Sequence, residues 1–102
     1  MDLNQQQWAA QLQEDNNAVI IDVRTLREFE EGHIPGALNI DIYMGQGFLD
    51  AIRRLEPSKR YYVYCRSGAR SAQACLLMKQ LGFNSAYNLL GGFLKWRGKV
   101  AG

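Results

Sequence analysis

The stretch from Tyr61 to Cys75, YYVYCRSGARSAQAC, combines a nucleophile with the composition of an anion-binding loop. Cys65 directly follows an apolar aromatic run, and a predicted helix begins a few residues later. A cysteine reacts as its thiolate, and a helix N-terminus and nearby cations both lower the pKa of a thiol. Arg66 and Arg70 would supply two permanent positive charges. Cys65 is therefore predicted to be a catalytic nucleophile rather than a structural core cysteine.

The loop after Cys65 has residues that suit an anion. Three small residues separate the two arginines, so their backbone N–H groups can turn inward and converge on one point. Such a nest of N–H groups would bind a thiolate, a sulfur anion or a phosphate. The candidate substrate-binding residues are Arg66, Ser67, Gly68, Ala69 and Arg70. Ser71, at the start of the predicted helix, is a candidate supporting residue.

For four other residues with reactive or polar side chains, the sequence favours a structural role over a catalytic one. Asp22 and Arg24 follow a predicted strand, where they could orient Arg70 or line the site, but a structural ion pair is the favoured interpretation. His33 lies in a Gly-His-Ile-Pro-Gly turn and is interpreted as a hydrogen-bonding brace of that turn. Cys75 falls among alanines and leucines inside a helix, which favours packing over a role as a resolving thiol.

Composition excludes several classes of site and partner. Two cysteines and one histidine do not have the spacing of a zinc site, a disulfide scaffold or a C-x-x-C redox motif, so we expect no metal and no cofactor. No apolar run approaches the ~20 residues of a transmembrane helix, and the polar start of the chain is unlike a signal peptide. We therefore expect a cytoplasmic protein without a membrane partner.

Charge is unevenly distributed along the chain. Residues 1–31 carry seven acidic and two basic side chains, whereas residues 32–102 carry three acidic and ten basic ones. The overall net charge of +2 does not indicate a nucleic-acid partner, and none is expected. The basic C-terminal two-thirds favours a small anionic ligand, although most of these charges are expected to be solvated surface.

Predicted strands and helices alternate along the chain. Apolar β-branched or aromatic runs predict four strands, at residues 18–23, 37–40, 60–65 and 85–90. Residues 1–3 give thin evidence for an edge strand. Capping boxes, helical spacing and glycine or proline stops predict helices after Asn4, after Thr25, over 48–55, over 71–81 and after Gly91–Gly92. The glycine pair is expected to permit close packing near the Cys65 loop, and Trp96 is expected in the core.

This alternation indicates βαβ units. We expect a single domain over residues 1–102, with a three-layer α/β/α architecture around a central parallel sheet of four to five strands. In such folds, functional sites lie beyond the C-terminal ends of the strands. Both Asp22 and Cys65 occupy that position.

Three stretches resemble the signature motifs of the rhodanese family, in the same order. IIDVRTLREFEEGHIPGALNI resembles the first motif, VYCRSGARSAQAC the active-site loop and its helix, and GFNSAYNLLGGFLKW the closing motif. The resemblance spans about residues 18–96. It implies the family's five-stranded parallel sheet between helices, with the first strand short or absent here.

The resemblance also implies a sulfurtransferase. The Cys65 thiolate would attack the outer sulfur of thiosulfate, release sulfite and become a persulfide, from which cyanide or a thiol would take the sulfur. Arg66 and Arg70 would hold the thiosulfate dianion, with Arg70 pointing into the loop. A persulfide is an alternative donor, and a sulfur-relay protein is a further candidate partner.

Two alternatives stay open on the same fold. One is a non-catalytic rhodanese-like protein-interaction module, although such modules usually lose the cysteine that is present here. The other is a phosphatase of the Cdc25 type or a similar arsenate reductase, which are related to the family that these motifs resemble. Those enzymes use C-x5-R, whereas Cys65 to Arg70 is C-x4-R, a shorter loop that favours a single sulfur atom on the cysteine.

Overall fold

The computed structural model describes all 102 residues and contains one five-stranded parallel sheet. Its strand order is β1-β5-β4-β2-β3, so the β4 strand that precedes Cys65 lies at the centre. The strands are β1 (Asp2–Leu3), β2 (Ala18–Asp22), β3 (Leu38–Asn39), β4 (Arg60–Tyr64) and β5 (Ala86–Leu89). The edge strand that residues 1–3 only weakly indicate is formed, and it pairs Asp2 with Asn88 and Leu3 with Leu89.

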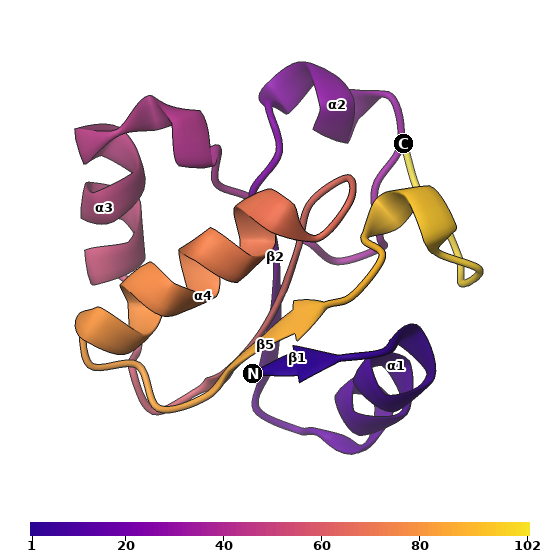
Figure 1. Ribbon diagram of the computed structural model, residues 1–102, viewed down its shortest axis with the longest axis horizontal. Coiled ribbons are helices and arrows are strands. Elements are labelled where there is room, and N and C mark those ends of the chain that lie inside the picture. The colour runs from indigo at the N-terminus through magenta and orange to yellow at the C-terminus, as the bar shows by residue number, and fades with distance from the viewer.

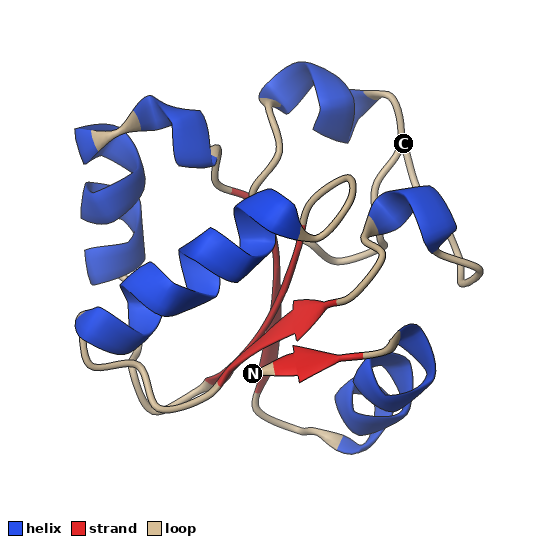
Figure 2. Cartoon of the chain, in the orientation of Figure 1, coloured by secondary structure: helices blue, strands red, loops and turns tan.

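Helices cover both faces of the sheet, which confirms the predicted three-layer α/β/α architecture (Figures 1 and 2). The α-helices are α1 (Gln5–Glu14), α2 (Leu26–Glu30), α3 (Gln46–Arg53) and α4 (Ala69–Gln80). Two short 3-10 helices complete the fold, η1 (Ile42–Met44) and η2 (Phe93–Lys95). One face of the sheet packs against α3 and α4, and the other packs against α1 and η2. No helix has the length and apolar character needed to cross a bilayer.

Local capping explains where α1 and α2 begin. The Asn4 side chain accepts from the backbone of Gln7 at 2.9 Å, and the Gln7 side chain accepts from the backbone of Asn4. Thr25 and Glu28 form the same reciprocal arrangement at the start of α2. Both predicted capping boxes are therefore present, and each satisfies backbone N–H groups that the first helical turn leaves unpaired.

The structure differs from the sequence prediction at the start of α4. This helix begins at Ala69, two residues before the predicted start at Ser71. Gly68 precedes it with φ of 103°, a conformation that glycine adopts without steric cost and that turns the chain directly into the helix. Ala69 and Arg70 therefore lie in the first helical turn, and only the residues up to Gly68 are irregular.

Strand β4 supplies side chains to both cores because successive residues face opposite sides of a strand. Tyr61, Val63 and Cys65 face the α3/α4 layer, whereas Tyr62 and Tyr64 face the α1 layer. The tyrosine hydroxyls are satisfied at the margins of the core; that of Tyr64, for example, accepts from the backbone N–H of Ile34 at 3.0 Å. Alternation thus buries four aromatic or aliphatic side chains and delivers the cysteine to the sheet's C-terminal edge.

Trp8 is the centre of the second core. It is fully buried, its indole N–H donates to the Tyr87 carbonyl at 3.0 Å, and its ring makes edge-on contacts with Tyr62, Tyr64 and Trp96. Trp96 packs into this cluster as expected, although it is half-buried rather than fully enclosed. The Trp8 side chain therefore joins α1, β4 and the C-terminal segment.

We expect Trp8→Ala to lower the free energy of unfolding by about 3–5 kcal/mol, because it leaves a large cavity where several elements meet. Urea unfolding followed by circular dichroism measures this change. Leu76→Ala is the control, since that helical side chain is 58% exposed and its loss should cost no more than about 0.5 kcal/mol. Equal losses in the two variants would contradict the central role of Trp8.

Candidate active site

The Sγ atom of Cys65 is a buried hydrogen-bond acceptor. Cys65 is 1% exposed and forms no disulfide. Its sulfur accepts from the backbone N–H of Gly68 at 3.1 Å and from the Ser71 hydroxyl at 3.3 Å. The Cys65 loop, residues 65–70, therefore turns the Gly68 N–H onto its own sulfur atom, and binding of an anion by the other N–H groups of the loop stays a prediction.

This environment favours the thiolate. Burial is the strongest single influence and raises the pKa of Cys65, because it removes charge from water. Hydrogen bonds from the Ser71 hydroxyl and from the backbone of Ser71, Gly68 and Ser67 act in the opposite direction. Together they outweigh burial, so the pKa of Cys65 lies below its ordinary value of 9.0. Neutral dipoles, rather than the two expected arginines, are the main stabilising groups.

Helix η2 binds two carbonyl groups of the loop on the side that faces away from Sγ. The backbone N–H of Phe93 donates to the Cys65 carbonyl at 2.8 Å, and that of Leu94 donates to the Arg66 carbonyl at 2.9 Å. Figure 1 shows η2 at the right of the loop between β4 and α4. With its carbonyls turned toward η2, the loop can direct its N–H groups toward Sγ.

Gly92 is what allows η2 to approach the loop this closely. Its φ is 60°, and a Cβ at this position would overlap the Arg66 carbonyl and lie 2.7 Å from the Cys65 carbonyl oxygen. The expectation that the glycine pair permits close packing near the loop is therefore confirmed for Gly92. The closing GGF segment and the cysteine loop form one packed unit.

Arg70 is paired with a residue that the sequence reasoning missed. Its Nη1 and Nη2 atoms donate to the two carboxylate oxygens of Glu28 at 2.8 and 3.0 Å, and its guanidinium lies 5.4 Å from the centre of the Tyr43 ring. The Arg70 hydrogen bonds hold the pKa of Glu28 at about 2. From the sequence, Glu28 belongs only to the helix predicted after Thr25, and no local pattern links it to a side chain 42 positions away.

Arg66 lies at the surface. It is exposed, makes no ion pair, and lines a small surface pocket with Arg24, Glu28 and Phe93. Ser67 and Ala69 are also exposed, so the loop presents its outer side to solvent while Sγ lies inside. Of the two predicted arginines, Arg66 is thus the cation that is free to meet an anion.

Asp22 and Arg24 form the structural ion pair that the sequence favoured. Both are buried, and Arg24 donates to the Asp22 carboxylate from Nε at 3.0 Å and from Nη2 at 2.7 Å. The same Nη2 donates to the Gly32 carbonyl, and the guanidinium lies 4.4 Å from the centre of the Phe93 ring. Neither side chain makes a hydrogen bond or an ion pair with Arg70 or Sγ, so the pair supports the loop through its neighbours Phe93 and Tyr64, whose ring centre lies 5.5 Å from the Arg24 guanidinium.

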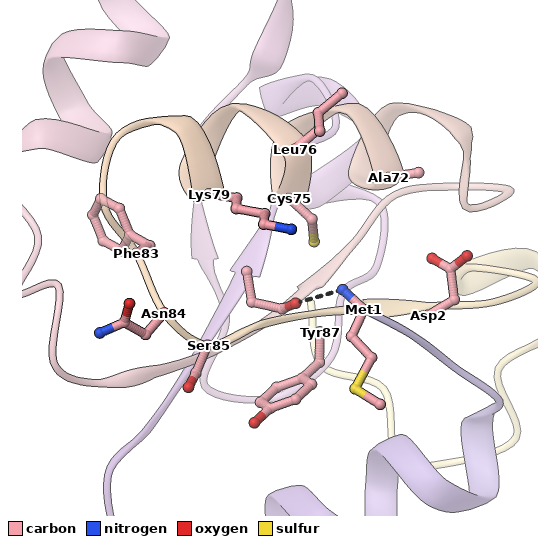
Figure 3. A pocket seen from close by; sticks show the side chains of 11 residues that line it. Met1, Asp2, Ala72, Cys75, Leu76, Lys79, Phe83, Asn84, Ser85 and Tyr87 are labelled. Atoms are coloured by element: carbon pink, nitrogen blue, oxygen red, sulfur yellow. Dashed lines mark hydrogen bonds between the residues drawn. The ribbon is translucent and has the colours of Figure 1, made fainter.

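His33 and Cys75 lie outside the loop. The His33 Nδ1 atom is 2.9 Å from the Phe29 carbonyl and its ring stacks on Phe29, as expected for a brace of its turn. Cys75 is one turn beyond Ser71 in α4, and burial raises the pKa of its thiol to about 12. It faces a separate pocket between α4, β5 and Met1 (Figure 3). These positions agree with the packing interpretation of Cys75.

Asn88 is a second residue that the sequence reasoning missed. It lies in β5, is 2% exposed, and accepts a hydrogen bond from the buried Ser71 hydroxyl. Its amide nitrogen lies 3.3 Å from the Gly68 carbonyl and 3.0 Å from a carboxylate oxygen of Asp2. The available signal was a polar residue within an otherwise apolar strand. Ser71, a candidate supporting residue, thus contacts Sγ directly and is itself held by Asn88.

No three His, Cys, Asp or Glu side chains are grouped so that they could hold a metal ion. The site instead consists of one thiol, convergent N–H groups, one hydroxyl and two arginines at its margin. This arrangement suits attack by sulfur on a small electrophile and stabilisation of a sulfur anion.

The family profile described as "Rhodanese-like domain" matches residues 5–99. The chain belongs to the rhodanese-like family. This rhodanese domain is 35% identical to a sulfurtransferase of Allochromatium vinosum, over 93% of the chain and 86% of that protein. It is 34% identical to the thiosulfate sulfurtransferase GlpE of Pseudomonas syringae, over 86% of the chain and 80% of the relative.

Other relatives extend beyond this domain or share its fold. The chain is 42% identical to Bacillus subtilis YqhL over 81% of the chain, and the match spans only 64% of the length of YqhL. The structure of the human single-domain sulfurtransferase TSTD1 superposes with a TM-score of 0.77 over 96% of this chain and 97% of that chain, at 25% identity. The rhodanese fold expected from the motifs is therefore confirmed.

Acid should selectively weaken the link between Glu28 and Arg70. Because folding lowers the pKa of Glu28 from 4.5 to about 2, its stabilisation is complete above about pH 4.5 and is lost as pH falls through 2. We expect wild type to be more stable than Glu28→Gln at neutral pH, with the difference shrinking across that window. Unfolding titrations from neutral to acid pH measure it. Glu30→Gln, at an exposed neighbour without an ion pair, is the matched control.

Gly92→Ala should disturb the Cys65 loop itself. The added methyl group would force η2 away from the carbonyls of Cys65 and Arg66, lowering stability and raising the pKa of the Cys65 thiol. Gly82→Ala is the matched control, since Gly82 also has a positive φ but has open space around its Cβ direction. Unfolding experiments and ultraviolet titration of the thiolate distinguish the two. If both variants lost stability equally and kept the same thiol pKa, the close approach at Gly92 would not matter.

Proposed function

We propose that this protein is a sulfurtransferase that carries a sulfane sulfur as a persulfide on Cys65. The observation that carries the proposal is the convergence of the Gly68 N–H and the Ser71 hydroxyl on a buried sulfur whose pKa is lowered. Membership of the rhodanese-like family and relatives named as sulfurtransferases support it.

In the first half-reaction, the Cys65 thiolate attacks the outer sulfur of thiosulfate. A bond forms between Sγ and that sulfur, the sulfur–sulfur bond of thiosulfate breaks, and its electron pair leaves with sulfite. The product is a persulfide anion, so charge is conserved. A persulfide donor would react in the same way, with a thiolate as the leaving group. The name of the Pseudomonas syringae relative favours thiosulfate as the substrate to test first.

In the second half-reaction, cyanide or a thiolate attacks the outer sulfur of the persulfide. The Sγ–Sδ bond breaks, its electrons return to Sγ, and thiocyanate or a new persulfide departs. The physiological acceptor in this proposal is a thiol, carried by a small molecule or a sulfur-relay protein. Dividing the transfer into two substitutions at sulfur is what a nucleophilic cysteine supplies.

The arginines have different parts in this proposal. Arg66 is exposed and unpaired, so its charge can attract a dianion to the mouth of the loop. Arg70 forms an ion pair with Glu28 and lies over the Tyr43 ring, so its guanidinium has a fixed position and its charge is already partly balanced. The cradle of Ser67, Gly68 and Ala69 supplies the N–H groups for the persulfide sulfur.

Incubation with thiosulfate should add one sulfur atom to the intact protein, at Cys65. Mass spectrometry of the whole chain and of its peptides measures the adduct, and cyanide should remove it with release of thiocyanate. We expect Cys65→Ser to abolish both steps. Cys75→Ala should retain them, because Cys75 makes no side-chain hydrogen bond to the loop and lines a separate pocket.

A parallel assay with an aryl phosphate separates this proposal from phosphatase chemistry, for which the six-residue loop is short. Phosphate release that depends on Cys65, without a sulfur adduct, would overturn the proposed function. An adduct on Cys75 alone would overturn the assignment of the nucleophile.

A further inference from the structure

A buried row of polar side chains connects Sγ with the edge of the sheet. The Ser71 hydroxyl lies 3.3 Å from Sγ and also contacts Oδ1 of Asn88, and both residues are at most 2% exposed. Asn88 is in turn hydrogen-bonded to Asp2 of β1 and to the Gly68 carbonyl of the Cys65 loop. Helix α4, strand β5 and strand β1 therefore each contribute one member.

The orientation of the Asn88 amide follows from its partners. Its Nδ2 lies within 3.3 Å of two oxygens, the Asp2 carboxylate and the Gly68 carbonyl, which can only accept hydrogen bonds. The NH₂ group must face them, so the Oδ1 atom must face Ser71. Because Oδ1 has no hydrogen to give, the hydroxyl of Ser71 is the donor in that contact.

Ser71 therefore has one hydrogen and two acceptors. It lies within reach of both Sγ and Asn88 Oδ1 but can donate to only one at a time. When Cys65 is a neutral thiol, the S–H group can donate to Ser71 while Ser71 donates to Asn88, and every group is satisfied. When Sγ is a thiolate, the charge-assisted bond to sulfur is the stronger one, and Asn88 loses its donor.

Persulfide formation moves the charge that decides this competition. In the persulfide anion the negative charge is on the outer sulfur, whereas Sγ is a neutral divalent sulfur and a weak acceptor. We propose that Ser71 and Asn88 form a hydroxyl switch, in which Ser71 donates to Sγ when that atom is charged and to Asn88 when it is not. This inference rests on the proposed persulfide function and deepens it.

The switch affects the two half-reactions differently. In the transfer step, the electrons of the Sγ–Sδ bond return to Sγ, so charge develops where the Ser71 hydroxyl can meet it. In the loading step, charge leaves Sγ, and the same hydrogen bond stabilises the starting thiolate. Ser71 should therefore accelerate release of sulfur to the acceptor and not its capture from the donor.

Other charged or titratable groups near Sγ do not produce this pattern. Arg70 in α4 is paired with Glu28 of α2, and Tyr43 of η1 lies over Arg70 rather than over the sulfur. Cys75 lies further along α4, and Asp2 is separated from Sγ by both Asn88 and Ser71. None of these groups has a proton that can alternate between Sγ and another acceptor.

The first test is an ultraviolet titration of the Cys65 thiolate in a Cys75→Ala background, where Cys65 is the only thiol. Ser71→Ala removes a donor, so the midpoint should move to higher pH. Asn88→Leu removes the competing acceptor at similar volume, so the midpoint should move to lower pH. In the double variant the downward shift caused by losing the Asn88 acceptor should vanish, because Oδ1 of Asn88 reaches Sγ only through the Ser71 hydroxyl.

Shifts in the same direction, or an Asn88→Leu shift that persists without Ser71, would overturn the switch. If Asn88→Leu does not fold, Asp2→Ala replaces it, since Asp2 lies at the exposed edge and its loss removes one of the two acceptors that orient the Asn88 amide. Asp2→Ala should move the midpoint of the Cys65 titration to lower pH, as expected for Asn88→Leu. A shift to higher pH would overturn the proposal.

The second test separates the half-reactions by rapid mixing. With Ser71→Ala at a pH above its thiol midpoint, loading from thiosulfate should keep its rate within about twofold, whereas transfer from the isolated persulfide to cyanide should slow by about tenfold. Equal slowing of both steps would indicate a merely structural role and overturn the inference. Because the titration needs no sulfur transfer, failure of wild type to form a persulfide would refute the proposed function separately.

Discussion

The site depends on the hydrogen bonds that turn the Cys65 loop around its own sulfur atom. The N–H of Gly68 faces Sγ because the carbonyls of Cys65 and Arg66 are bound on the opposite side by Phe93 and Leu94. That second set of bonds requires a glycine at position 92, where any side chain would overlap the loop. Burial by itself opposes ionisation of the Cys65 thiol. The hydrogen-bond donors of the loop outweigh this effect, so the thiolate is favoured.

The charged residues around the loop position it more than they neutralise the sulfur. Arg70 is paired with Glu28 and ties α4 to α2, and Arg24 is paired with Asp22 and lies against Phe93. Both pairs satisfy their own charges, which limits the cost of removing them from water. The sulfur is left among neutral dipoles, which stay in place as charge moves during a transfer reaction.

A site that alternately carries charge on Sγ and on an outer sulfur needs donors for both atoms. The backbone N–H groups are fixed, but the Ser71 hydroxyl can rotate between Sγ and Asn88. Asn88 is oriented by the edge strand through Asp2, so even the two-residue strand β1 contributes to the site. The sheet thus does more than deliver the cysteine to its C-terminal edge.

The sequence by itself determined the features that neighbouring residues specify. Capping boxes at Asn4 and Thr25, the apolar run of β4, and the cysteine followed by small residues and arginines are local patterns. They sufficed to predict the layers, the parallel sheet and the Cys65 loop. Only the tertiary structure decided that Arg70 is paired with Glu28 and that Ser71 meets Asn88. Those partners lie 42 and 17 positions apart. Whether two such side chains touch depends on strand register and helix rotation, which packing of the whole core sets and no local pattern records.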